Sequence, residues 1–184
     1  MNTMYRAALQ EMQGVFDKLD DSSVSAALDM IAKAKSIVVF GAGRERLQIM
    51  GFAMRLYHMG LRVAVVGDMT TPPVGEGDLF MLTCGPGEIS TALALLGVAK
   101  RAGAQVLLIT AQPKGRAADF ADCVVTLPAQ TMADDQGETI SSVLPMGSLF
   151  EGALFVLFEV MVLRLRDALR IDAGAMRANH TNLE

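Results

Sequence analysis

Short apolar segments alternate with longer segments of helical periodicity along most of the chain. Helices are expected over 44–59 and 87–102, with a shorter one near 114–121. The apolar segments are continuous rather than alternating, which is typical of parallel strands covered on both faces. They are SIVVFG (36–41), LRVAVV (61–66), LFMLTC (79–84), AQVLLIT (104–110) and DCVVTL (122–127). Repeated strand–helix–strand units predict an α/β fold with a parallel sheet and right-handed crossovers.

Further helices flank this predicted sheet. Two are expected before it, within 3–18 and 22–35, and Ser22 or Asp21 is the expected cap of the second. A long helix from about Gly147 to Leu169 follows the last strand, and it is apolar nearly all round. Such a helix is buried on more than one side, which favours a symmetric interface with a second copy of the chain.

Length and pattern indicate one domain. The 184 residues suffice for one substantial core. We divide the chain into N-terminal helices at about 3–35, an α/β core at about 36–170 and a C-terminal tail at 171–184. The segment 128–145 is the one long polar loop, a kind of segment that often carries function.

Composition and charge narrow the range of partners. The formal net charge is −4 without a run of like charges, so neither nucleic acid nor a membrane is an expected partner. The N-terminal MNTMYRAALQEMQ lacks the apolar core of a signal peptide. Cys84 and Cys123 are interpreted as two buried free thiols in a reducing compartment. A cytoplasmic protein is therefore expected, and two histidines and two scattered cysteines do not give the spacing of a zinc site.

Ligands of such folds bind beyond the carboxyl ends of the strands, which directs attention to GAGRER (41–46). A dinucleotide fingerprint would need a third glycine where Arg46 stands. One interpretation is a tight turn at Gly41 and Gly43 whose amides favour an anion, assisted by Arg44 and Arg46. The other is a glycine turn that only reverses the chain and carries solvated charges.

The segment TCGPGEIST (83–91) repeats this geometry after the third strand. Gly85 and Gly87 permit close backbone approach, whereas Pro86 removes one amide donor. Glu88 is expected in the first turn of the following helix. There it would either stabilise the helix dipole or serve as a catalytic base facing the strand ends.

Four longer motifs carry a family resemblance. They are FAMRLYHMG (52–60), VVGDMTTPPVGEGDL (65–79), PMGSLFE (145–151) and HTNLE (180–184). Together they resemble the 6-phospho-3-hexuloisomerases, sugar isomerase (SIS) domain enzymes of the ribulose monophosphate pathway. The resemblance implies a flavodoxin-like three-layer αβα sandwich with five parallel strands, assembled as a dimer or tetramer. It also implies interconversion of 3-hexulose 6-phosphate and fructose 6-phosphate through a cis-enediolate, with neither metal nor organic cofactor.

The resemblance also assigns residues to the site. Glu88, Glu151 and His180 correspond to the ionisable groups of the family motifs and are the expected catalytic residues. A neighbouring subunit helps to complete the site in this family, so His180 is expected to dock in trans. The expected substrate-binding residues are Gly41, Gly43, Arg44, Arg46, Cys84, Gly85, Gly87, Ser90 and Thr91.

The chain departs from the family at the phosphate loop. Glu45, Cys84, Pro86 and Ile89 stand where family members generally place hydroxyls. Each lost hydrogen bond to an ionic partner costs on the order of 1.5 to 3 kcal/mol. Either Ser90 and Thr91 or the two arginines replace these donors, or the substrate is a different or non-phosphorylated sugar derivative. A non-catalytic SIS protein that binds a carbohydrate derivative is the third alternative.

Overall fold

Five parallel strands form one sheet in the computed structural model, which describes residues 3–183. The sheet order is β2–β1–β3–β4–β5, which is the flavodoxin-like order and confirms the predicted fold class. All five strands lie within the predicted apolar segments. They are β1 (Ile37–Phe40), β2 (Val63–Val65), β3 (Leu79–Thr83), β4 (Gln105–Thr110) and β5 (Cys123–Thr126).

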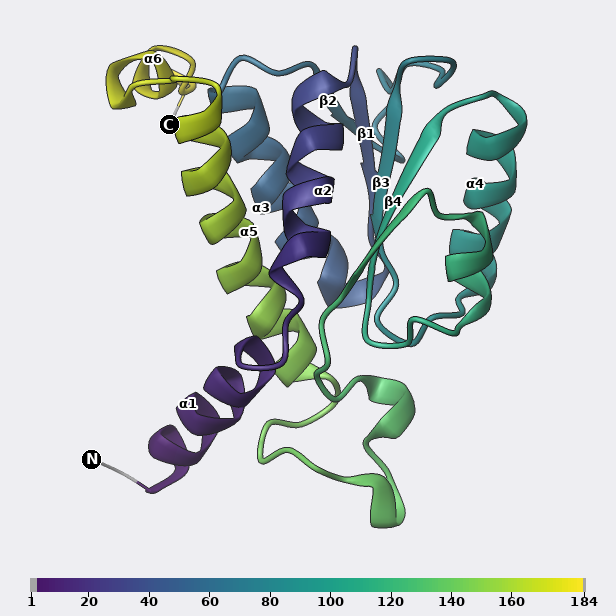
Figure 1. Ribbon diagram of the computed structural model, residues 1–184, viewed down its shortest axis with the longest axis vertical. Helices are drawn as coiled ribbons and strands as arrows, with labels where there is room; N and C mark the ends of the chain where they lie inside the picture. The colour runs from purple at the N-terminus through teal and green to yellow at the C-terminus, as the bar shows by residue number, and fades with distance from the viewer. Residues whose placement is uncertain (1–2, 184) are drawn as a thin grey trace.

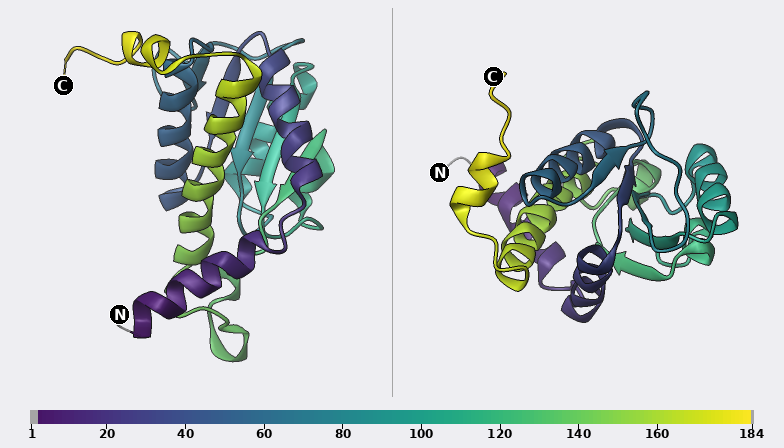
Figure 2. Two further views of the ribbon diagram at one scale, coloured as in Figure 1. Left: turned by 60° about the vertical axis from the view of Figure 1, so that its left-hand side comes forward. Right: turned by 90° about the horizontal axis from the view of Figure 1, so that it is seen from above.

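Helices cover both faces of the sheet (Figures 1 and 2). One layer consists of α2 (Asp21–Lys33), α3 (Gly43–His58) and α5 (Ser148–Ala168). The other consists of α4 (Ser90–Arg101) and the short 3₁₀ helix η1 (Arg116–Phe120). The three layers explain why the strands are apolar on both faces, since helices pack against each face.

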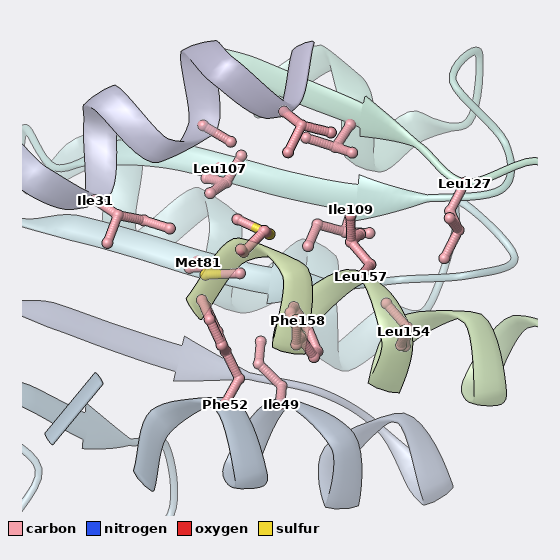
Figure 3. Packing of buried hydrophobic residues seen from close by; sticks show 14 of the residues in the cluster. Ile31, Ile49, Phe52, Met81, Leu107, Ile109, Leu127, Leu154, Leu157 and Phe158 are labelled. Atoms are coloured by element: carbon pink, nitrogen blue, oxygen red, sulfur yellow. The ribbon is translucent and has the colours of Figure 1, made fainter. Parts of the chain in front are cut away.

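Side chains of alternate strand positions enter two separate cores. Val39, Met81 and Ile109 point towards α3 and α5, where Phe52 and Phe158 stack with ring centroids 4.6 Å apart (Figure 3). Phe40, Leu82 and Leu108 belong to the opposite core beneath α4. Successive side chains along each strand therefore point to opposite faces of the sheet and enter different cores.

The remaining elements lie at the two ends of the sheet (Figure 1). Helix α1 (Thr3–Phe16) packs on α5, near the loop that leads from β5 to α5. That loop contains two short 3₁₀ helices, η2 (Met132–Asp134) and η3 (Gly137–Thr139). The tail forms the short helix α6 (Ala173–Ala178) at the other end of the molecule. Glu184, which ends the HTNLE motif, lies outside the described residues, as do Met1 and Asn2.

Two predicted helix starts were wrong. Asp20, rather than Ser22 or Asp21, caps α2, because its carboxylate accepts the amide of Ser22 at 3.0 Å. Helix α4 begins at Ser90 rather than at residue 87, since Gly87 has a left-handed backbone with φ of 75°. Within residues 3–183, no helix is both long and apolar enough to cross a bilayer.

Candidate active site

A cavity of about 250 Å³ opens at the carboxyl edge of the sheet. It lies between the segments that follow β1 and β3, where crossovers leave the sheet in opposite directions and ligands of this fold class bind. Its lining comes from three parts of the chain: Ala42, Gly43, Arg44 and Glu45; Pro86 and Ile89; and Thr131, Met132, Met146, Gly147, Phe150 and Glu151.

Three helices begin at this cavity. Its lining includes Ala42, Ile89 and Gly147, which are the N-cap residues of α3, α4 and α5. None of the three N-caps makes a side-chain hydrogen bond to its helix. The first amides of each helix and the positive ends of three helix dipoles therefore favour an anion in this cavity.

Glu151 is an acidic side chain inside this cavity. It stands in the first turn of α5, and only 9% of the residue is exposed. Arg44 Nη2 from the first turn of α3 lies 3.0 Å from Glu151 Oε2. This contact is an ion pair without hydrogen-bond alignment, and Oε2 has no hydrogen-bond partner among residues 3–183. Burial raises the pKa of Glu151, and the Arg44 charge partly opposes that rise.

Glu45 is a second acid in the same lining. Its carboxylate accepts the amide of Gly85, with N–O distances of 3.1 Å to Oε1 and 3.2 Å to Oε2. Burial raises the pKa of Glu45 to about 7; the nearby Thr83 hydroxyl and the Gly85 amide oppose the rise, and the charge of Glu151 adds to it. The Thr83 hydroxyl itself is buried without an aligned partner among the described side chains. A buried pair of carboxyl groups with raised pKa values is typical of proton-transfer sites.

Glu88 lies beside this cavity rather than in its lining. It precedes α4 instead of occupying the first turn of that helix, so the expectation that it belongs to the first turn was wrong. Its carboxylate is exposed and accepts a hydrogen bond of 2.9 Å from Arg116 Nη1. Ser90 and Thr91 are exposed in the first turn of α4, also outside the cavity lining.

The glycines of the two turns make close backbone approach possible. A Cβ atom on Gly41 would lie 2.9 Å from both the Arg46 amide nitrogen and Thr83 Oγ1. Gly87 meets Gly115, where an added Cβ atom on Gly115 would lie 2.7 Å from Gly87 Cα. Gly43 has a φ of 55° and begins α3. These contacts fix the path of both turns around the cavity.

Two other expected binding residues point elsewhere. Cys84 is fully buried in the core beneath α4, and burial raises the pKa of its thiol to about 12. The guanidinium of Arg46 lies over Gly67, where an added Cβ atom would be 3.3 Å from Arg46 Nη2. Neither side chain is part of the cavity lining. Cys123 was expected to be buried but is only partly buried.

His180 lies at the opposite end of the sheet from Glu151. Its ring centroid is 5.1 Å from that of His58, which is the last residue of α3. Asn179 Nδ2 donates to the carbonyl oxygen of His58 at 3.0 Å, which attaches the tail there. Since α3 begins at the cavity and has 16 residues, it separates His180 from the cavity by roughly 24 Å. A single chain does not bring His180 to Glu151.

The chain matches a family model over residues 30–155, which include all five strands and the start of α5. The model describes the SIS domain. The chain belongs to the SIS domain family. The family assignment made from the four sequence motifs is therefore confirmed.

Other SIS proteins resemble the chain along most of its length. A 3-hexulose-6-phosphate isomerase from Mycobacterium gastri is 38% identical over 91% of this chain and 83% of its own. The enzyme of that name from Bacillus subtilis is 31% identical over 96% and 95%. The crystal structure of a Methanococcus jannaschii protein superimposes on this chain with a TM-score of 0.85. The function inferred for that protein from its structure is that of a 3-hexulose-6-phosphate isomerase. The M. jannaschii protein is 27% identical, and the match covers 98% of each chain.

The sequence did not reveal every residue that lines the cavity of this SIS domain. Thr131, Met132 and Met146 reach it from the segment between β5 and α5, and Phe150 reaches it from the first turn of α5. The sequence indicates the polar loop 128–145 as a functional segment but does not indicate a particular residue within it. Glu45 was noticed as a departure from the family and not as a side chain bonded to the Gly85 loop.

Proposed function

We propose that this SIS domain is an isomerase that interconverts 3-hexulose 6-phosphate and fructose 6-phosphate. The observation that carries the proposal is the convergence of three uncapped helix N-termini on a cavity that also contains Glu151. The helix termini suit a phosphate and an enediolate, both of which are anionic. The names of the M. gastri and B. subtilis relatives support the same substrate.

The chemistry needs one proton to move between adjacent carbons. A base takes the proton from C2 of the 3-hexulose, and that C–H electron pair forms the C2=C3 bond as the carbonyl oxygen on C3 gains a proton. The proton then returns to C3 while the hydroxyl on C2 loses its own, which gives the C2 ketone of fructose 6-phosphate. No electrons leave the substrate, so the reaction is a pure isomerisation.

We assign the base to Glu151, because it lies in the cavity lining with a raised pKa and an arginine partner. Glu88 remains a proposed catalytic group at the rim, where Arg116 holds it. His180 is proposed to act in the site of a neighbouring subunit. Gly43 and Arg44 belong to the same proposed binding surface, and Gly41, Gly85 and Gly87 shape the two turns that support it.

Self-association is part of the proposal. Helices α3 and α5 enclose a groove of about 290 Å³ that also contacts His180. Large apolar side chains that line this groove are exposed in a single chain, among them Leu47, Met54 and Phe155. A second copy of the chain is the proposed partner, since isologous contact would cover α5 on the side away from the sheet. The free thiols favour a reducing cytoplasm.

The test is proton exchange in heavy water. The protein is incubated with fructose 6-phosphate in D₂O, and NMR follows replacement of the C3 hydrogen by deuterium and formation of the 3-hexulose. We expect both for the wild-type chain. Fructose serves as the unphosphorylated control, and faster exchange with fructose than with its phosphate would favour the non-phosphorylated alternative.

Replacing each glutamate by glutamine distinguishes the catalytic roles of Glu151 and Glu88. Glu151→Gln is expected to lower kcat by orders of magnitude, and Glu88→Gln by a smaller factor, because Glu151 lines the cavity and Glu88 does not. The melting temperature of each variant serves as the control for folding. A larger loss of kcat in Glu88→Gln than in Glu151→Gln would show that Glu88 is the base. Binding of fructose 6-phosphate without any exchange at C3 would contradict the isomerase and favour a binding protein.

A further inference from the structure

Glu45 occupies a place that suits an external anion. Both oxygens of its carboxylate accept the single N–H of Gly85, and the side chain lines the cavity where α3, α4 and α5 begin. The fit is close, because a Cβ atom on Gly85 would lie only 2.8 Å from Glu45 Oε1. A phosphate that uses the same amide must therefore displace this side chain.

The charges around Glu45 make that displacement depend on its protonation. Arg44 precedes it on α3, Glu151 acts on it from α5, and the Thr83 hydroxyl and the Cys84 thiol lie near it at the end of β3. Burial raises the pKa of Glu45 to about 7, so both charge states are populated near neutral pH. A phosphate dianion beside an ionised Glu45 would be repelled, whereas a neutral carboxyl group would not repel it.

We propose that the Glu45 carboxylate occupies the phosphate-binding position at the Gly85 amide before substrate binds. It leaves this position to the substrate phosphate by taking up one proton. This inference rests on the proposed function. On binding, the carboxylate gains H⁺ to become a carboxylic acid, and the Gly85 amide passes to a phosphate oxygen. The new O–H group then donates to the phosphate. A carboxylic acid thereby supplies a hydroxyl donor at a position where the ionised carboxylate is an acceptor only.

Glu45 is thus a specificity residue whose effect depends on pH. Above pH 7 each unit of pH makes the required proton about tenfold scarcer, so the affinity for a phosphorylated sugar should fall by about tenfold per unit. An unphosphorylated sugar does not compete for the Gly85 amide as an anion and should bind with little pH dependence. The phosphate itself stays dianionic in this range, because its second pKa is about 6.

The experiment is calorimetric titration of fructose 6-phosphate into the full chain between pH 7 and 8.5. Measurements in two buffers of different ionisation enthalpy give the number of protons taken up. We expect close to one proton at pH 8 and above, with Kd rising about tenfold per unit. Glu45→Gln should show no proton uptake and, because pH 8.5 is about 1.5 units above the pKa of Glu45, roughly thirtyfold tighter binding than wild type at that pH. Glu76→Gln, which removes an exposed carboxylate at the amino end of the sheet, should behave as wild type.

Three outcomes would overturn the inference. Tight binding by wild type with no proton uptake would show that Glu45 does not move or is not protonated, and the proposed function would stand. Binding by Glu45→Gln alone, at every pH, would show that Glu45 excludes phosphate permanently. If neither wild type nor Glu45→Gln binds fructose 6-phosphate or exchanges its C3 hydrogen, both the proposed function and this inference are contradicted.

Discussion

Arg44 and Glu151 connect the first turns of two helices that come from distant parts of the sequence. Their charged atoms are 3.0 Å apart, with the arginine largely exposed and the glutamate largely buried. The pair lies where α3 and α5 start, so the carboxylate also benefits from the positive end of the α5 dipole. Desolvation outweighs both effects and leaves the pKa of Glu151 raised, which suits a base that works near neutral pH.

Removal of the arginine charge should change the pH dependence of the reaction. In Arg44→Met the pKa of Glu151 rises further, because the opposing charge is gone and the burial remains. We expect kcat/KM at pH 7 to fall by tenfold or more and the acid limb of its pH profile to move to higher pH. Arg44→Lys should restore part of the activity and shift the limb back.

The control for this prediction is Lys33→Met, which breaks an exposed i,i+4 ion pair with Asp29 on α2. Its pH profile should coincide with that of wild type. If Arg44→Met loses activity while its acid limb stays in place, then Arg44 contacts substrate and does not tune Glu151.

The stability of the chain should also depend on Glu45. Its folded-state pKa of about 7 lies above the ordinary value of 4.5, so the folded chain holds a proton that the unfolded chain releases between these pH values. Unfolding therefore becomes easier as pH rises from about 4.5 to 7, by up to about 3 kcal/mol, and the loss is constant above pH 7. Below pH 4.5 both states are protonated and the effect vanishes.

Thermal melting of wild type and Glu45→Gln at a series of pH values tests whether stability falls as pH rises. The melting temperature of the variant relative to wild type should increase by several degrees between pH 5 and pH 8. A constant offset between the two melting temperatures reflects the changed side chain and carries no information on its ionisation. A difference that is flat or decreases over this range would show that Glu45 is ionised throughout.

The hydrophobic pattern was sufficient to predict the sheet, because strands buried on both faces are apolar without interruption. It was also sufficient to place the candidate site at the carboxyl edge, since parallel strands bring all their carboxyl ends together. The start of α4 was not predictable in this way. Gly87 and Glu88 suit a first helical turn by composition, but the left-handed backbone of Gly87 delays the helix to Ser90.

Side-chain directions within the site depend on packing that a single sequence does not display. Cys84 and Glu45 were both noticed as replacements for hydroxyls. Only the fold separates them, since Cys84 enters the core beneath α4 whereas Glu45 reaches the Gly85 amide. His180 is a similar case: its motif indicates function, but its place beside His58 follows from the path of the tail.

The exposed face of α3 and α5 should govern assembly. Phe155 is 58% exposed in the single chain, and covering such a side chain contributes about 1.5–3 kcal/mol. Phe155→Asp is expected to shift the protein towards monomer in size-exclusion chromatography with light scattering. Val98→Asp, at a position on α4 that is 51% exposed, is the matched control and should retain the wild-type mass. Equal oligomer masses for wild type, Phe155→Asp and Val98→Asp would show that the interface lies on another face.

The distance between His180 and Glu151 within one chain predicts complementation between chains. If each site combines Glu151 of one subunit with His180 of another, then Glu151→Gln and His180→Ala are each inactive as pure proteins. In a mixed dimer, one site receives both substitutions and the other receives neither. Co-expression with two different affinity tags, followed by purification through both, should therefore recover about half of the wild-type activity per dimer. A tetramer built from such pairs gives the same fraction when the pairs are mixed. Doubly tagged protein that stays inactive, although both chains are present in equal amounts, would show that His180 does not act in trans.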